Sequence, residues 1–186
     1  SGKSFLLKML TKHLTDQNKQ VMYLNFEHPD TFGIQTSEKL YKHIIKNVDS
    51  NKKMYFLFDE IGEVKNWQKL INGLRVAYDC DIYITGSNAN LLSGELSTYL
   101  SGRYVEINIY PLSFIEISNF SKDKNKDILL EEYLKFGGFP SVYLTGDEEI
   151  KASVLKGIYN SIILKDVSLR GNITQVDLLL KLSLYL

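Results

Sequence analysis

The sequence predicts an α/β fold, with a parallel sheet flanked by helices and followed by a small helical subdomain. Over the first 110 residues, short apolar runs alternate with segments of helical periodicity, which is typical of βαβ units. Beyond that point the strand signals stop and helical patterns dominate. The break falls near Tyr110-Pro111, so we expect an α/β core over residues 1–110 and a helical subdomain over 111–186.

The predicted strands are short and rich in β-branched, aromatic and aliphatic residues. The clearest covers residues 54–58, a nearly continuous apolar run that ends in Asp59-Glu60. Such a run indicates a central parallel strand that is buried on both faces. The other expected strands cover residues 21–26, 82–85 and 104–109.

Apolar residues recur at helical spacing between these strands and after them. In the core we expect helices over residues 5–14, 37–48, 67–78 and about 89–100. In the second part we expect helices over 114–120, 128–136, 150–167 and 176–186. A polar connector over 121–127 and a turn at Gly137-Gly138-Phe139-Pro140 separate some of these helices.

Charge and cysteine content narrow the function classes. Lys plus Arg and Asp plus Glu number 22 each, so no global positive field is available to hold a nucleic acid. Cys80 is the single cysteine and cannot form an intrachain disulfide, and no run of about 18 apolar residues suggests a membrane span. We therefore expect a cytoplasmic protein.

The first residues contain a candidate phosphate-binding motif, which is weak evidence by itself. Ser1-Gly2-Lys3-Ser4 leads directly into a helix and matches the tail of the phosphate-binding pattern G-x-x-x-x-G-K-[ST]. In such a loop, backbone N–H groups around Gly2 and the helix N-terminus cradle phosphates. Lys3 would reach the β- and γ-phosphates, and the Ser4 hydroxyl would coordinate Mg²⁺. By itself the tripeptide also occurs by chance in solvated loops.

A pair of carboxylates strengthens this interpretation. Asp59 and Glu60 follow the most apolar strand, where P-loop ATPases place their second motif. Asp59 would hold Mg²⁺ through water, and Glu60 would orient and activate the attacking water. The alternative is a strand that ends in a solvated acidic turn. Two carboxylates downstream of Gly-Lys-Ser favour the functional interpretation.

Two further positions extend the candidate site. Asn88 or Ser87, after the strand over 82–85, could contact the γ-phosphate or the water, and either could also cap the next helix. Arg103 precedes the strand over 104–109 and could act as an arginine finger in a neighbouring subunit's site. A surface arginine that pairs with a carboxylate explains Arg103 equally well.

Several segments together resemble a family of bacterial and archaeal AAA-type ATPases that carry a C-terminal domain of unknown function. The matching motifs are Gly2-Lys3-Ser4, Phe58-Asp59-Glu60-Ile61, Ile84-Thr85-Gly86-Ser87-Asn88, Leu100-Ser101-Gly102-Arg103, Tyr110-Pro111-Leu112-Ser113-Phe114-Ile115-Glu116, Gly137-Gly138-Phe139-Pro140 and Ile163-Leu164-Lys165-Asp166-Val167. The resemblance implies an AAA-like fold, ATP with Mg²⁺, and the roles given above for Lys3, Ser4, Asp59, Glu60 and Arg103. The family's loop and central strand begin before Ser1, so we expect the chain to be an ATP-binding core truncated at both ends.

The sequence thus predicts an ATPase that couples hydrolysis to a conformational change. The alternatives are a nucleotide-gated switch without significant turnover and a nucleic-acid-linked ATPase, which the neutral charge disfavours. The expected partners are ATP, a second copy of the chain through Arg103 and an unknown protein client. The three histidines lie far apart and lack partners at ligand spacing, so we expect no zinc site.

Overall fold

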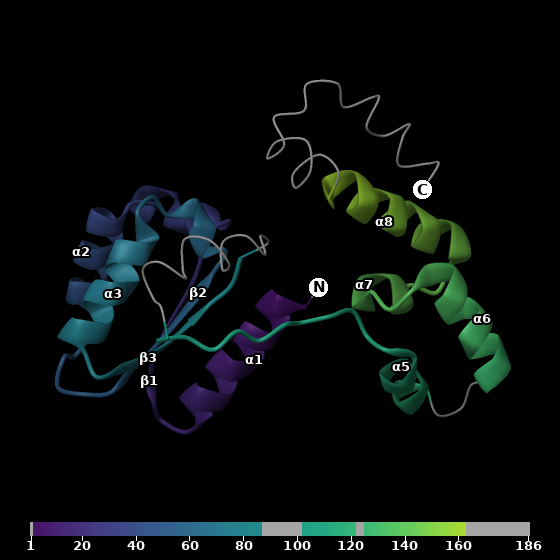
Figure 1. Cartoon of the computed structure of the whole chain (residues 1–186), viewed down its shortest axis with the longest axis horizontal. Helices are drawn as coiled ribbons and strands as arrows, with labels where there is room; N and C mark the ends of the chain where they lie inside the picture. Colours follow the sequence, from purple (N-terminus) through teal and green to yellow (C-terminus); the bar gives the residue numbers. More distant parts are fainter. Residues whose placement is uncertain (1, 87–101, 122–124, 163–186) are drawn as a thin grey trace. The chain divides into compact units, whose positions relative to one another are not determined.

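The computed structural model describes residues 2–86, 102–121 and 125–162 (Figure 1). Its contacts divide the chain into two compact units, one covering Gly2–Asn108 and the other beginning at Ile109. The expected limits of 1–110 and 111–186 stay predictions as functional domain boundaries.

The first unit contains a parallel sheet of three strands in the order β1-β2-β3. Pairing aligns Asn25 with Asp59 and Phe58 with Ile84, so the carboxyl ends of the strands lie at one edge of the sheet. The strands are β1 (Gln20–Asn25), β2 (Met54–Asp59) and β3 (Cys80–Ile84). The sheet and its flanking helices confirm the predicted α/β class.

Helices cover both faces of this sheet (Figure 1). Helix α1 (Lys3–Asp16) packs on one face, and α2 (Ser37–Asn47) and α3 (Trp67–Ala77) pack on the other. Two short 3₁₀ helices, η1 (Pro29–Ile34) and η2 (Ile61–Glu63), follow the carboxyl ends of β1 and β2. The expected helices over 5–14, 37–48 and 67–78 are confirmed, with ends that differ by one or two residues.

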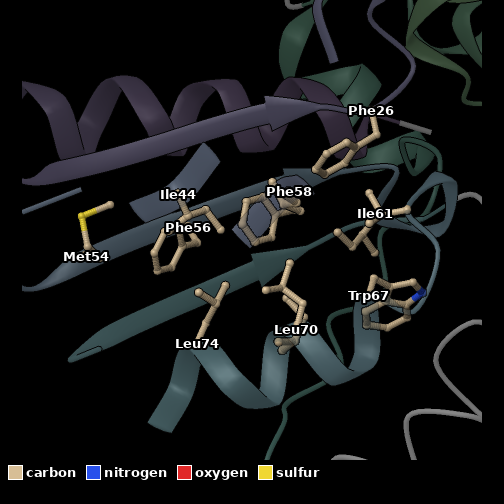
Figure 2. Close-up of a cluster of buried hydrophobic side chains, with 12 residues drawn as sticks. Phe26, Ile44, Met54, Phe56, Phe58, Ile61, Trp67, Leu70 and Leu74 are labelled. Atoms are coloured by element: carbon tan, nitrogen blue, oxygen red, sulfur yellow. The ribbon is translucent and has the colours of Figure 1, made fainter. Parts of the chain in front are cut away.

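The larger hydrophobic core lies between the sheet and helices α2 and α3 (Figure 2). Phe56 and Phe58 of β2 are fully buried there, with ring centroids 5.7 Å apart. On the opposite face, Leu57 packs with Leu7 and Leu14 of α1. Because β2 is covered on both sides, its residues from Met54 to Phe58 form a continuous apolar run rather than an alternating pattern.

The predicted strand over residues 104–109 is wrong. This segment does not pair with any strand in the described part of the chain, and Val105 and Ile107 are 86% and 73% exposed. Its alternating aromatic and β-branched residues have the right composition for a strand. A strand also needs hydrogen bonds from a neighbour, and composition does not supply these.

The second unit is helical in its described residues, as expected from the sequence. It contains α5 (Phe114–Phe120), α6 (Lys126–Phe136), α7 (Pro140–Tyr143) and α8 (Glu148–Ser161). Ser113 and Glu116 form a capping box that starts α5. Leu112 donates its N–H to the carbonyl of Gly138 at 2.7 Å, and a Cβ at position 138 would meet the Leu112 oxygen at 1.8 Å. The predicted Gly-Gly turn therefore needs a residue without a side chain at this contact.

Some predicted elements lie outside the described residues. These are the helices over 89–100 and 176–186 and the last part of the helix over 150–167. None of the helices in the described ranges is long and apolar enough to cross a membrane.

Candidate functional site

Asp59, the last residue of β2, is fully buried and lies at the centre of a cluster of hydroxyl groups. Ser4 Oγ donates to its Oδ1 at 3.0 Å, and Thr85 Oγ1 donates to the same oxygen at 2.5 Å. The phenol of Tyr23 donates to Oδ2 at 3.1 Å. A buried carboxylate is costly unless donors surround it, and these three O–H groups satisfy both of its oxygens.

Ser4 brings the start of α1 to this carboxylate. Gly2 caps the helix with φ 93° and ψ −2°, a left-handed conformation that favours glycine, and its carbonyl accepts the N–H of Leu6 at 3.0 Å. The first N–H groups of any helix lack helical acceptors, and the helix dipole is positive there. The end of α1 that carries Gly2, Lys3 and Ser4 is therefore suited to bind an anion such as a phosphate.

Thr85 joins the two carboxylate residues. Its hydroxyl donates to Asp59 and accepts the backbone N–H of Glu60 at 3.1 Å. Its carbonyl also accepts the N–H of Ile61 at 3.0 Å. Glu60 itself has φ 54° and ψ 50°, a left-handed conformation that is uncommon for a residue with a side chain. The Thr85 contacts help to hold the chain in this bend, which directs it from the sheet edge into η2.

Tyr23 approaches Asp59 from the neighbouring strand β1. Burial is the main cause that raises the pKa of Tyr23 to about 12, and the negative charge of Asp59 raises it further. The phenol therefore keeps its proton at neutral pH and acts as a donor to the carboxylate.

The structure places the predicted site residues as follows. Ser4 and Asp59 are hydrogen-bonded, Gly2 and Lys3 lie at the same helix start, and Glu60 adjoins Asp59. Arg103 is exposed, and within the described ranges no hydrogen bond or ion pair joins it to Ser4, Asp59 or Glu60. Asn88 and Ser87 lie outside the described residues.

Sequence reasoning did not identify Tyr23 or Thr85 as site residues. Thr85 ends a predicted strand that runs beside the carboxylates, so its place after an apolar run was an available signal. No comparable signal marks Tyr23, because it is one of twelve tyrosines in the sequence. The contact between Tyr23 and Asp59 depends on how β1 pairs with β2.

The donor set fits a magnesium ion. The Ser4 hydroxyl and the Asp59 carboxylate offer hard oxygen atoms 3.0 Å apart. In the described ranges, no group of three or more His, Cys, Asp or Glu residues is arranged to hold a metal. A site with only one or two protein ligands is typical of Mg²⁺. The ion keeps several waters and binds substrate phosphates as well.

Comparisons with known proteins show the family of the chain. A family model described as an AAA domain matches residues 1–118. An uncharacterized protein of Haemophilus influenzae is 45% identical over 194 residues, which cover 100% of this chain and 48% of that protein. An uncharacterized protein of Methanocaldococcus jannaschii is 35% identical over 185 residues, which cover 92% of this chain and 40% of that protein. The chain thus spans about half the length, or less, of these curated relatives.

Proposed function

The chain belongs to the AAA-domain family of nucleotide-binding proteins, and from this premise we propose that it binds ATP with Mg²⁺ and hydrolyses ATP to ADP and phosphate. The observation that carries the proposal is the 3.0 Å hydrogen bond from Ser4 to Asp59. It connects a helix start suited to phosphate with a buried carboxylate suited to a cation. A solvated loop and an unrelated acidic turn would not be expected to share such a contact.

The start of α1 binds the phosphates in this proposal. Gly2 allows the backbone to turn into the helix, so that the N–H groups of the first turn face the anion. Lys3 neutralises the β- and γ-phosphates. Ser4 and Asp59 would hold Mg²⁺, and the bound ion supplies positive charge that offsets the charge on the phosphate oxygens.

Glu60 is the residue that we assign to hydrolysis. It is half-buried and follows Asp59 directly, and its backbone is held by Thr85. A carboxylate in this position can accept a proton from the attacking water. Asn88 would contact the γ-phosphate or that water, and Arg103 would stabilise transition-state charge in the site of a second copy of the chain. The helical unit would respond to hydrolysis and act on a protein client.

A binding and turnover experiment tests this function. The full-length protein that contains this chain is titrated with a fluorescent ATP analogue and Mg²⁺, and phosphate release is measured on the same samples. Lys3→Ala is the test variant, and Lys8→Ala, an exposed lysine further along α1, is the matched control. We expect Lys3→Ala to lose binding and Lys8→Ala to keep it.

The outcomes separate the possible functions. Binding with phosphate release supports an ATPase. Tight binding without release, with partners supplied, would replace the ATPase by a nucleotide-gated switch. Release that increases with DNA in a salt-sensitive way would identify a nucleic-acid-linked ATPase. Absence of binding by the parent protein would overturn the whole proposal.

A further inference from the structure

We propose that Tyr23 is a positioning residue for the magnesium site, because it holds the Asp59 carboxylate in the orientation that the cation needs. The inference rests on the proposed function and adds to it a residue on a strand that carries none of the motifs discussed above. In this proposal Tyr23 acts through Asp59 and not on the nucleotide, because its phenol donates to Oδ2 of that carboxylate.

The two oxygens of Asp59 have different partners. Ser4 and Thr85 both donate to Oδ1, whereas in the described part of the chain Tyr23 is the residue that donates to Oδ2. Donors on both oxygens restrict rotation of the carboxylate about its terminal bond. If the phenol were removed, Oδ2 would stay buried but lose this donor. The carboxylate could then turn away from Ser4.

The orientation of Asp59 also determines that of Ser4. The Ser4 hydroxyl has one proton, which it donates to Asp59, and its lone pairs are left for a cation. If the carboxylate turns, the Ser4 proton follows it and the lone pairs point elsewhere. Tyr23 therefore acts on the cation through Asp59 and Ser4, as residues behind metal ligands commonly do.

The sheet itself provides a matched control. Tyr23, Leu57 and Tyr83 are aligned across β1, β2 and β3, and all three pack in the hydrophobic cluster beneath α1. Tyr83 thus occupies the equivalent place on the other side of β2. Within the described ranges, no hydrogen bond joins Tyr83 to Asp59. Replacement by phenylalanine removes one hydroxyl in either case.

The test measures binding of a fluorescent ATP analogue to the full-length protein over a series of Mg²⁺ concentrations, and in EDTA. We compare the parent protein, Tyr23→Phe and Tyr83→Phe. For Tyr23→Phe we expect the Mg²⁺ concentration that gives half of its maximal effect on nucleotide binding to rise by about 10-fold or more. This is the usual consequence of losing a residue that orients a metal ligand. Its affinity for nucleotide in EDTA should stay unchanged, and Tyr83→Phe should match the parent in both measurements.

Three results would overturn the inference while the proposed function stands. The first is an equal Mg²⁺ dependence for Tyr23→Phe and the parent. The second is loss of nucleotide affinity in EDTA, because the phenol would then support the pocket rather than the cation ligand. The third is an equal defect in Tyr83→Phe, which would indicate general packing. Nucleotide binding by the parent that does not respond to Mg²⁺ would instead count against the proposed magnesium site as a whole.

Discussion

The hydroxyl of Thr85 lies 2.5 Å from Oδ1 of Asp59, so the residue after β3 is bonded to the last residue of β2. The same hydroxyl accepts the N–H of Glu60 at 3.1 Å. A single side chain thus supports both carboxylate residues of the candidate site.

Thr85→Val removes the hydroxyl with little change in shape. The N–H of Glu60 and one oxygen of Asp59 then lose a partner, so we expect the free energy of unfolding to fall by about 1–3 kcal/mol. Thr15→Val, at an exposed position near the end of α1, should change it by less than about 0.5 kcal/mol. Urea denaturation of both variants measures the difference, and equal midpoints would contradict the prediction.

Glu60→Gln keeps the size of the side chain and removes its negative charge. If Glu60 accepts the proton of the attacking water, phosphate release should slow by roughly 10²- to 10⁴-fold while nucleotide binding is retained. Glu63→Gln is the control, because Glu63 is an exposed carboxylate three residues further along, in η2. A similar rate for the two variants would show that Glu60 is not the base.

Gly2→Ala tests the backbone at the start of α1. Apart from its chain neighbours, no atom in the described part of the chain lies within 4 Å of an added Cβ. The effect should therefore come from φ 93°, and we expect a cost of about 1–2 kcal/mol together with weaker nucleotide binding. Gly73→Ala provides the opposite case. Gly73 lies inside α3 with equal space around it and no positive φ, so alanine should stabilise the protein by about 0.5–1 kcal/mol. Thermal unfolding of the full-length variants should therefore give shifts of opposite sign.

Lys151→Met tests the helical unit. Lys151 of α8 is 5% exposed and pairs with Glu132 of α6, so its replacement breaks an ion pair between two largely buried side chains. We expect a cost of about 3–5 kcal/mol. Lys135→Met breaks the exposed pair with Glu148 and should cost less than about 1 kcal/mol. Denaturation of the helical unit, followed by circular dichroism, should separate the two variants, and equal losses would contradict the prediction.

The capping box of α5 makes a prediction about pH. The backbone N–H of Ser113, and then its hydroxyl, lower the pKa of Glu116 below its ordinary value of 4.5. A lowered pKa in the folded state means that this stabilisation is present above pH 4.5 and is lost as the pH falls through the lower folded value. An NMR titration should show the low pKa, and Ser113→Ala should move it part of the way back. An unchanged pKa in that variant would exclude a contribution from the hydroxyl.

Several elements could be predicted from sequence because their signals are local. The continuous apolar run of β2 follows from burial on both faces, and the helical spacing that begins after Gly2-Lys3-Ser4 predicted α1. Phosphate binding at the start of this helix stays a prediction. Asp59 and Glu60, at the end of this apolar run, could be singled out for the same reason. The segment over 104–109 shows the limit of such signals, since its composition suits a strand and the structure forms none.

The sequence by itself determined the fold class and the longer helices of both units in their described residues, but it did not predict the short helix α7 or the two 3₁₀ helices. Only the tertiary structure decided which side chains surround Asp59. The reason is physical: hydrogen bonds from Tyr23 and Thr85 cross between strands, so they depend on strand order and register. Those properties arise from pairing between segments that lie far apart in the chain, and neither composition nor periodicity within one segment specifies them.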